Sequence, residues 1–188
     1  LKKYFFYKKI YNILIVLIVA FATIKYHDVY NSKRKFMDLQ NVNLNLSVEA
    51  NLIDKKFKNL KWISTIFPTD PIKEINLIKH TAKILKNDKR NKMMITEYQF
   101  FSFLIEENLN IPNRWYTHDN NSYPLKNHKY YNFYKNHFNK LIKEQNIQVI
   151  YIAGDLANIE NFKIYLDNIC FIKNEINEMT STYELSDC

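Results

Sequence analysis

The chain begins with an uncharged run between lysines. Residues 10–24 (IYNILIVLIVAFATI) carry no charge, and the run follows Lys8 and Lys9 and precedes Lys25. A transmembrane helix needs about 20 apolar residues, with a lower limit near 17. Flanking lysines and tyrosines extend a short run, because their apolar parts lie in the membrane while their polar ends reach water. The pattern therefore predicts a transmembrane helix with a basic flank in residues 1–26.

A signal peptide is the alternative interpretation of this segment. The first nine residues, LKKYFFYKK, are like a basic n-region, residues 10–19 are like an apolar h-region, and Ala20 and Ala22 fit a small-x-small cleavage site. The sequence starts at Leu1 and not at methionine, so we expect it to belong to a longer chain. That expectation favours a retained helix.

After residue 26 the pattern is that of a water-soluble protein. Residues 27–59 are predicted to be an exit helix and a linker, with Ser47 capping a short helix. In residues 60–188, short apolar runs alternate with segments of helical periodicity. The predicted strands are 61–65, 93–96, 148–153, 170–173 and 183–188, and the predicted helices are 71–85, 97–105, 130–145 and 159–169.

Two local signals support the predicted helix starts. Asp70 followed by Pro71 is typical of an N-cap and first helical position, and Thr96 to Gln99 fits a capping box. Strands that alternate with helices favour crossover connections. The fold class is therefore predicted to be α/β, with a mostly parallel sheet flanked by helices, strands 93–96 and 148–153 adjacent at its centre, and the transmembrane helix before it.

The charge pattern argues against a nucleic-acid partner. The formal net charge is +8, but the lysines are scattered and arginine occurs only at Arg34, Arg90 and Arg114. Proteins that bind nucleic acids cluster their cations and favour arginine forks. The abundance of Lys, Asn and Ile indicates an AT-rich coding sequence, which explains the charge without a nucleic acid.

Candidate ligand-binding residues follow the predicted strands, since ligands of α/β sheets bind beyond the carboxyl ends of the strands. The candidates are Thr96, Tyr98, Arg114, Trp115 and Asp155. An aromatic platform with an arginine and carboxylates suits a sugar or an anionic headgroup. The structural alternative is that Thr96 caps a helix, Asp155 caps a turn and Trp115 covers the sheet edge.

No catalytic residue, metal site or cofactor is predicted. A loop that cradles phosphate needs several glycines, and the chain has only Gly154. The histidines lack a metal-ligand spacing, and no CxxC or GxSxG motif is present.

The two cysteines predict a disulfide. Cys170 opens one of the last two strand-like runs and Cys188 closes the other. An antiparallel hairpin centred on Met179 would place them directly opposite each other, at a Cα separation that a disulfide accepts. Such a bond implies an oxidising, extracytoplasmic compartment. The alternative is a buried thiol at Cys170 and an unrelated one at the terminus.

Four stretches resemble a known class of membrane protein. They are KNLKWI (58–63), MMITEYQFF (93–101), IPNRWY (111–116) and QVIYIAG (148–154). In this order after a membrane helix, they resemble the C-terminal end of polytopic proteins from AT-rich marine alphaproteobacteria, which look like GT-C glycosyltransferases of the dolichyl-phosphate-mannose type. The resemblance implies use of lipid-linked sugars. That family's catalytic carboxylates lie in an early extracytoplasmic loop that these stretches do not include, so no catalytic residue is carried over.

The sequence thus predicts a non-catalytic C-terminal domain on the periplasmic side of the inner membrane. Its expected partners are the lipid bilayer, upstream membrane helices of the same parent chain, and a sugar or lipid-linked acceptor. A single-pass or secreted periplasmic binding module is the alternative. A cytoplasmic domain is the third hypothesis, because lysines are balanced on the two sides of the helix.

Overall fold

The computed structural model describes residues 2–32, 42–113, 123–154, 160–166 and 169–187. The chain divides into two compact units, Leu1–Asn45 and Leu46–Cys188. The second unit therefore includes residues 46–59, for which an exit helix and linker were predicted.

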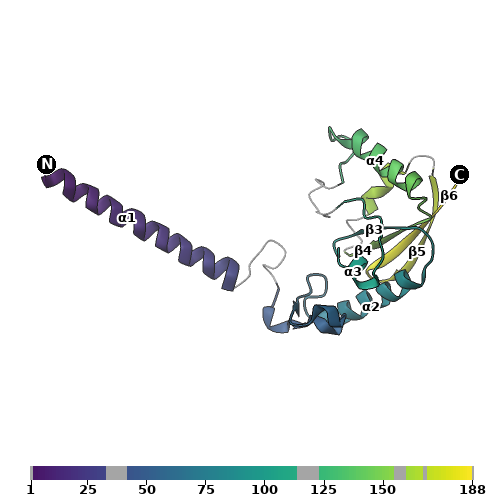
Figure 1. Cartoon of the computed structure of the whole chain (residues 1–188), viewed down its shortest axis with the longest axis horizontal. Helices are drawn as coiled ribbons and strands as arrows, with labels where there is room; N and C mark the ends of the chain where they lie inside the picture. Colours follow the sequence, from purple (N-terminus) through teal and green to yellow (C-terminus); the bar gives the residue numbers. More distant parts are fainter. Residues whose placement is uncertain (1, 33–41, 114–122, 155–159, 167–168, 188) are drawn as a thin grey trace. The chain divides into compact units, whose positions relative to one another are not determined.

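The first unit contains a long helix. α1 covers Lys2–Tyr26 and continues as a π-helical turn, η1, over His27–Ser32 (Figure 1). Between Tyr7 and Ser32 the helix is long and apolar enough to span a membrane, its most apolar stretch has a mean hydropathy of 1.7, and none of that stretch is buried. The uncharged run is therefore helical, as predicted, with apolar side chains exposed along its length. A signal sequence shares these properties.

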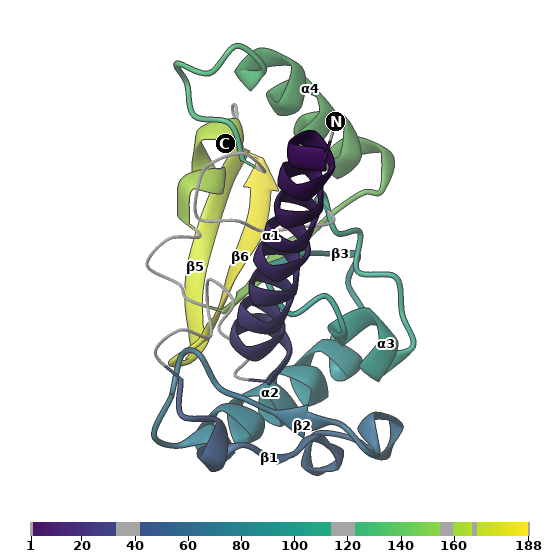
Figure 2. The same cartoon turned by 90° about the vertical axis from the view of Figure 1, so that its left-hand side faces the viewer.

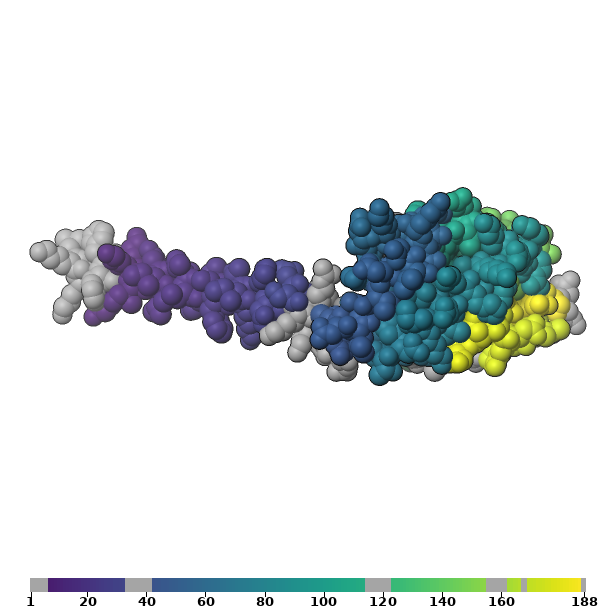
Figure 3. Space-filling model, turned by 90° about the horizontal axis from the view of Figure 1, so that it is seen from below, coloured from purple at the N-terminus to yellow at the C-terminus, as the bar shows by residue number. Residues whose placement is uncertain are grey.

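A short 3₁₀ turn, η2 (Leu44–Leu46), includes the last residues of the first unit and the first residue of the second, and a two-stranded ribbon follows it. β1 (Val48–Glu49) pairs antiparallel with β2 (Lys61–Trp62), and the 3₁₀ turns η3 (Ala50–Leu52) and η4 (Lys55–Phe57) lie between them. The ribbon packs against the first helix of this unit, α2 (Pro71–Asn87) (Figures 2 and 3).

The ribbon corrects two predictions. Residues 61–65 are not the first strand of the main sheet, and a strand follows Ser47 where a capped helix was predicted. The strand at Lys61–Trp62 ends early because the Ser64 hydroxyl accepts the backbone N–H of Phe67 at 2.7 Å and turns the chain. The pairing partner of this short strand is local, so it never reaches the main sheet.

The main sheet has four strands in the order β3-β4-β6-β5. These are β3 (Lys92–Thr96), β4 (Val149–Ala153), β5 (Ile169–Asn177) and β6 (Thr180–Asp187). β3 and β4 are parallel, but β6 runs antiparallel to both β4 and β5. The α/β class is confirmed, and the prediction of a mostly parallel sheet was wrong. A tight turn between β5 and β6 returns the chain directly, and such a turn can join only antiparallel strands.

The pairing of β3 with β4 agrees with the prediction, but β3 lies at an edge of the sheet and not at its centre. That edge is covered locally. The Met94 N–H donates to the Leu109 carbonyl at 2.9 Å, and the Asn110 amide donates to the Lys92 carbonyl at 2.9 Å. These bonds occupy groups that an open edge would offer to another strand.

Helices cover both faces of the sheet (Figure 1). α2 and α3 (Phe101–Ile105) cover the face that carries Met94 and Tyr151. The opposite face carries Met93 and Ile150 and packs against α4 (Tyr131–Glu144) and the 3₁₀ segment η5 (Glu160–Tyr165). Adjacent strand residues thus enter different cores, as the two-residue period of a strand requires. This explains why β3 and β4 read as continuous apolar runs.

Two predicted helices agree with the structure in their extent, and a third does not. α2 and α4 form close to their predicted ranges. The predicted helix 159–169 is wrong over Glu160–Tyr165, which is 3₁₀ helix, and residues 159 and 167–168 lie outside the described ranges.

The start of α2 confirms the predicted N-cap. The Asp70 carboxylate accepts the Lys73 N–H at 3.0 Å, and Pro71 occupies the first helical turn. We expect Asp70→Ala to lower the free energy of unfolding by about 1 kcal/mol, because an N–H of the first turn loses its acceptor. Urea unfolding of the full chain in detergent measures this. Asp70→Ser keeps an acceptor and is the control; an equal loss in both variants would contradict the capping role.

Candidate functional site

Two of the five predicted ligand-binding residues lie in the described part of the chain. Thr96 ends β3, and Tyr98 follows in the turn to α3. Arg114, Trp115 and Asp155 lie outside the described residues. The five-residue site therefore stays a prediction.

Thr96 stabilises the turn that follows β3. Its side chain is buried, its hydroxyl accepts the Tyr98 N–H at 2.9 Å, and its carbonyl accepts the Gln99 side-chain amide at 2.7 Å. The predicted capping box is wrong, because α3 begins only at Phe101 and Gln99 bonds the carbonyl of Thr96. Thr96 shapes the turn that leaves β3, which is the structural alternative for this residue.

The hairpin turn covers the carboxyl end of β4. Gly154 donates its N–H to the Met179 carbonyl at 3.0 Å, and Met179 is fully buried. Gly154 has φ 135°, a conformation that only glycine adopts readily. In an open parallel sheet, the carboxyl ends of the strands border a crevice in which ligands bind. In this chain, the turn between β5 and β6 lies at the carboxyl end of β4 instead.

Polar contacts hold that turn to α2. Thr81 and Thr180 are buried, and their hydroxyl oxygens lie 2.7 Å apart. The Asn177 amide also donates to the Thr81 hydroxyl at 3.2 Å, and Lys73 pairs with Glu178 at 2.5 Å. These contacts satisfy the polar groups among themselves and so favour a structural role for this end of the sheet.

Sequence reasoning missed Glu74, which is the centre of a polar cluster. Glu74 lies on the buried face of α2 and is only 1% exposed. Its carboxylate accepts the Trp62 indole N–H at 3.0 Å and the Tyr98 hydroxyl. Glu74 stands four positions before Ile78, and so within the apolar periodicity of the helix, which is a signal that could have indicated this cluster.

Aromatic rings extend from this carboxylate toward the surface. The ring centroids of Trp62 and Phe100 are 5.6 Å apart, those of Phe100 and Phe57 are 5.5 Å apart, and those of Phe57 and Phe103 are 6.0 Å apart. Aromatic rings beside a carboxylate can bind a sugar. Here, however, both carboxylate oxygens of Glu74 accept bonds from within the fold, so the cluster fastens the β1–β2 ribbon to α2.

A second polar cluster lies at the amino ends of β3 and β4. Arg90 forms a fork on Asp88 with bonds of 2.8–3.2 Å, and the Tyr151 hydroxyl donates to Asp88 at 2.7 Å. Burial raises the pKa of Asp88, but the bonds from Arg90 and Tyr151 outweigh burial and lower the pKa to about 2. Arg90 also pairs with Glu184 at 3.1 Å, so the cluster joins the end of α2 to β6.

Lys92, the first residue of β3, is the buried cation of this cluster. Its side chain is 1% exposed, and its ammonium group donates to the Asp88 carbonyl at 2.7 Å and pairs with Glu107 at 2.6 Å. A buried cation requires such partners, because removing it from water is costly. The cluster lies at the opposite end of the strands from the predicted ligand site, and it stabilises the fold.

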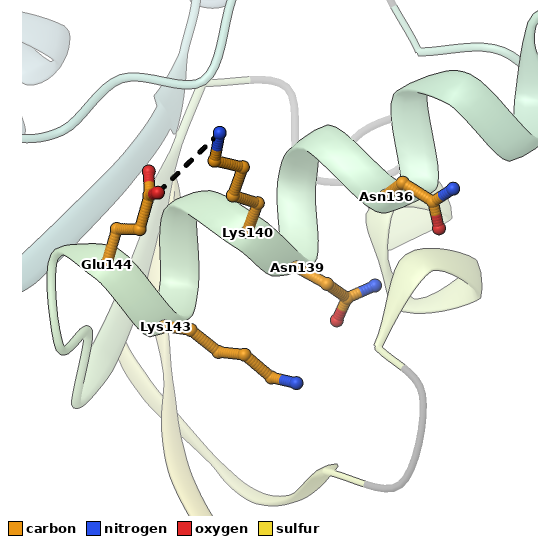
Figure 4. A pocket seen from close by; sticks show the side chains of 5 residues that line it. All are labelled: Asn136, Asn139, Lys140, Lys143 and Glu144. Carbon is orange, nitrogen blue, oxygen red and sulfur yellow. Dashed lines mark ion pairs between the residues drawn. The ribbon is translucent and has the colours of Figure 1, made fainter.

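The surface of α4 carries an open hollow of about 390 Å³. It is lined by Asn136, Asn139, Lys140, Lys143 and Glu144, which all project from this helix (Figure 4). Asn139 donates to the Tyr165 carbonyl at 2.7 Å, and Lys140 pairs with Glu144 at 3.6 Å. All the lining residues come from one helix, and Asn139, Lys140 and Glu144 already form bonds within the fold. The hollow therefore lacks the converging polar groups of a binding site.

Cys170 is disulfide-bonded. The one other cysteine, Cys188, lies outside the described residues, so the identity of the partner stays a prediction. The predicted antiparallel pairing of the last two strands is confirmed, but its register is wrong: Cys170 stands opposite Ser186, and the pairing shifts at a bulge between Glu175 and Asn177. The turn lies at residues 178–179 and is not centred on Met179, which explains the shift.

Within the described ranges, no group of three or more His, Cys, Asp or Glu side chains could hold a metal ion. The chain matches no known protein family, no curated protein and no solved structure.

Proposed function

We propose that this chain is a membrane-anchored module whose second unit binds or positions a partner on the extracytoplasmic side and performs no chemistry itself. The observation that carries the proposal is the helix between Tyr7 and Ser32, which is apolar enough to span a bilayer and presents unburied apolar side chains. The bond at Cys170 supports the side of the membrane, since disulfides persist in oxidising compartments.

The resemblance noted in the sequence refines this proposal. It favours a parent protein that transfers sugars from lipid carriers in the inner membrane, with this domain on the periplasmic side. The domain would then shape access of a sugar or lipid-linked acceptor, or stabilise the upstream membrane helices. The polar clusters around Glu74 and Asp88, whose groups bond within the fold, support a structural or positioning role.

The membrane anchor is tested by charges at the centre of α1. We expect Leu14→Arg with Leu17→Arg to release the chain from the membrane fraction, because each arginine at the bilayer centre costs about 2.5–3.5 kcal/mol on insertion scales. Alkaline extraction of membranes from expressing cells measures this. His27→Arg with Asn31→Arg is the control, since arginines at a helix end reach the interface. If the Leu14 and Leu17 variant stays fully in the membrane, the anchor is not this helix.

A mass measurement on the same membrane preparation distinguishes a cleaved, secreted protein from one that keeps its membrane helix. The mass of the mature protein shows whether the segment up to Ala22 is retained, as the proposal requires. The side of the membrane follows from thiol labelling of non-reduced, denatured protein, in which Cys170 is expected to resist the reagent. Labelling of Cys170 without a reductant would contradict the extracytoplasmic proposal.

A further inference from the structure

The connection between the two strands of the ribbon forms a closed loop, residues 50–60. Its ends meet where the Ala50 N–H donates to the Leu60 carbonyl at 2.9 Å. One side of the loop is anchored, because Ala50 and Ile53 are buried and Phe57 packs against the core. The loop is therefore a fixed structure of the second unit, and its other side faces solvent.

The solvent side of the 50–60 loop carries two leucines. Leu52 is 46% exposed and Leu60 is 55% exposed. Asn59, with φ 70°, sets the tight turn just before Leu60. Phe103, which is 54% exposed, adjoins the loop, because the Lys56 ammonium lies 4.8 Å from the centre of its ring. A single exposed leucine is ordinary, so the leucines alone indicate nothing.

The charge of the loop supplies the second observation. Residues 55, 56 and 58 are lysines, and the one acidic residue, Asp54, accepts the Lys56 N–H at 2.8 Å. Lys56 pairs with Glu106 at 2.6 Å. Lys55 and Lys58 form no ion pair with any residue that the structure describes, and both are exposed. Lysines with no partner in the fold are attracted to an anionic bilayer surface.

The length of the chain keeps this loop near the membrane. The helix that can span the bilayer ends at Ser32, and the loop starts at Ala50. Fully extended, the chain between them reaches at most about 65 Å. A loop tethered within that distance meets the lipid surface at an effective concentration that the tether sets, which adds to any attraction between the two.

We propose that the 50–60 loop docks on the anionic surface of the bilayer that holds α1. Leu52 and Leu60 enter the boundary between headgroups and acyl chains, and Lys55 and Lys58 contact lipid phosphates. Exposed leucines beside cations are the pattern by which peripheral elements bind such surfaces. The inference rests on the proposed function, because it requires the chain to be inserted in a membrane.

The test uses the full chain in lipid nanodiscs made of phosphatidylcholine alone or of phosphatidylcholine mixed with phosphatidylglycerol. Hydrogen exchange of the amides in residues 50–60 is the measurement. We expect exchange to slow several-fold in the anionic discs, and the difference to shrink at high salt because ions screen the lysines. Equal exchange in the two kinds of disc would overturn the docking.

Charge reversal assigns the effect to the loop. Lys55→Glu with Lys58→Glu is expected to abolish the difference between the discs, and so is Leu52→Ser with Leu60→Ser. Lys79→Glu with Lys83→Glu changes the net charge equally on the exposed side of α2 and should keep the difference. If this control abolishes the difference as well, the attraction is not specific to the loop and the proposal is wrong.

Recovery of the chain with the discs separates the two proposals. A chain that does not enter the discs overturns the membrane anchor, and the docking with it. A chain that enters the discs but shows no lipid-dependent exchange in residues 50–60 overturns the docking alone.

Discussion

Replacing Glu74 with alanine is expected to lower the free energy of unfolding by about 3 kcal/mol, because the indole N–H of Trp62 and the hydroxyl of Tyr98 lose their acceptor and a cavity remains. The loss should also be local. Glu74 fastens β2 to α2, so amide exchange in β1 and β2 should speed up more than exchange in β4. Urea unfolding followed by tryptophan fluorescence gives the first value, and hydrogen exchange gives the second.

Glu74→Gln is the matched control for this prediction. The glutamine oxygen can accept from Trp62 while its amide donates to the Tyr98 oxygen, so shape and bonding are retained. We expect a loss of about 1 kcal/mol, as for exchange of one charged hydrogen bond for a neutral one. Equal losses in the alanine and glutamine variants would mean that the negative charge, and not the two bonds, holds the ribbon.

Acid is expected to remove the contribution of Asp88 between about pH 4 and pH 2. The pKa of Asp88 is lowered from 3.8 to about 2 in the folded chain, so the folded state binds fewer protons than the unfolded state in this range. The stabilisation is complete above the unfolded pKa and is lost as the pH falls through the folded one. A shift of this size corresponds to about 2 kcal/mol.

Asp88→Asn isolates that contribution. Asparagine does not titrate, so the difference in unfolding free energy between the natural chain and the variant should shrink by about 2 kcal/mol from pH 5 to pH 2. Urea unfolding at several pH values in that range measures it. A difference that stays constant with pH would contradict the lowered pKa, since the other carboxylates titrate in both chains.

The parts of the fold that follow from local pattern were predictable. The continuous apolar runs of β3 and β4 indicated strands covered on both faces, and Asp70 with Pro71 indicated where α2 begins. The apolar period of α4 marked its buried side in the same way, at Tyr134 and Phe138. In each case a side chain contacts the sheet or its own helix, so the repeat in the sequence carries the information.

The hairpin that decides the sheet topology left no such pattern. Its turn, at Glu178 and Met179, contains no glycine or Asn-Gly pair, and Met179 is buried in the core rather than exposed in the turn. β5 extends to Asn177 through charged residues, because its outer side faces water. The two cysteines did suggest an antiparallel hairpin between the last two strands, and that pairing is confirmed. What no local pattern indicated is that β6 also pairs antiparallel with β4, which makes the main sheet mostly antiparallel.

The polar clusters depend on residues that are distant in the sequence. Lys92 forms an ion pair with Glu107, and hydrogen bonds join Thr81 to Thr180 and Tyr151 to Asp88. No repeat or motif in the sequence links the members of these pairs. Glu74 is the exception, since a charged residue within an apolar helical face stands out in the amino-acid sequence itself.

The two edges of the main sheet differ in a way that limits assembly. The outer edge of β3 is occupied by Leu109 and Asn110, whereas β5 pairs only with β6 among the described strands. Open-ended polymerisation through strands requires two free edges, one to receive a neighbour and one to offer the next. Among the described strands, β5 is thus the edge of the main sheet along which a further strand could pair, since the contacts at β3 are already made within the fold. Two copies that paired along β5 would use that edge in both, so growth of the main sheet by strand addition at its two ends is disfavoured.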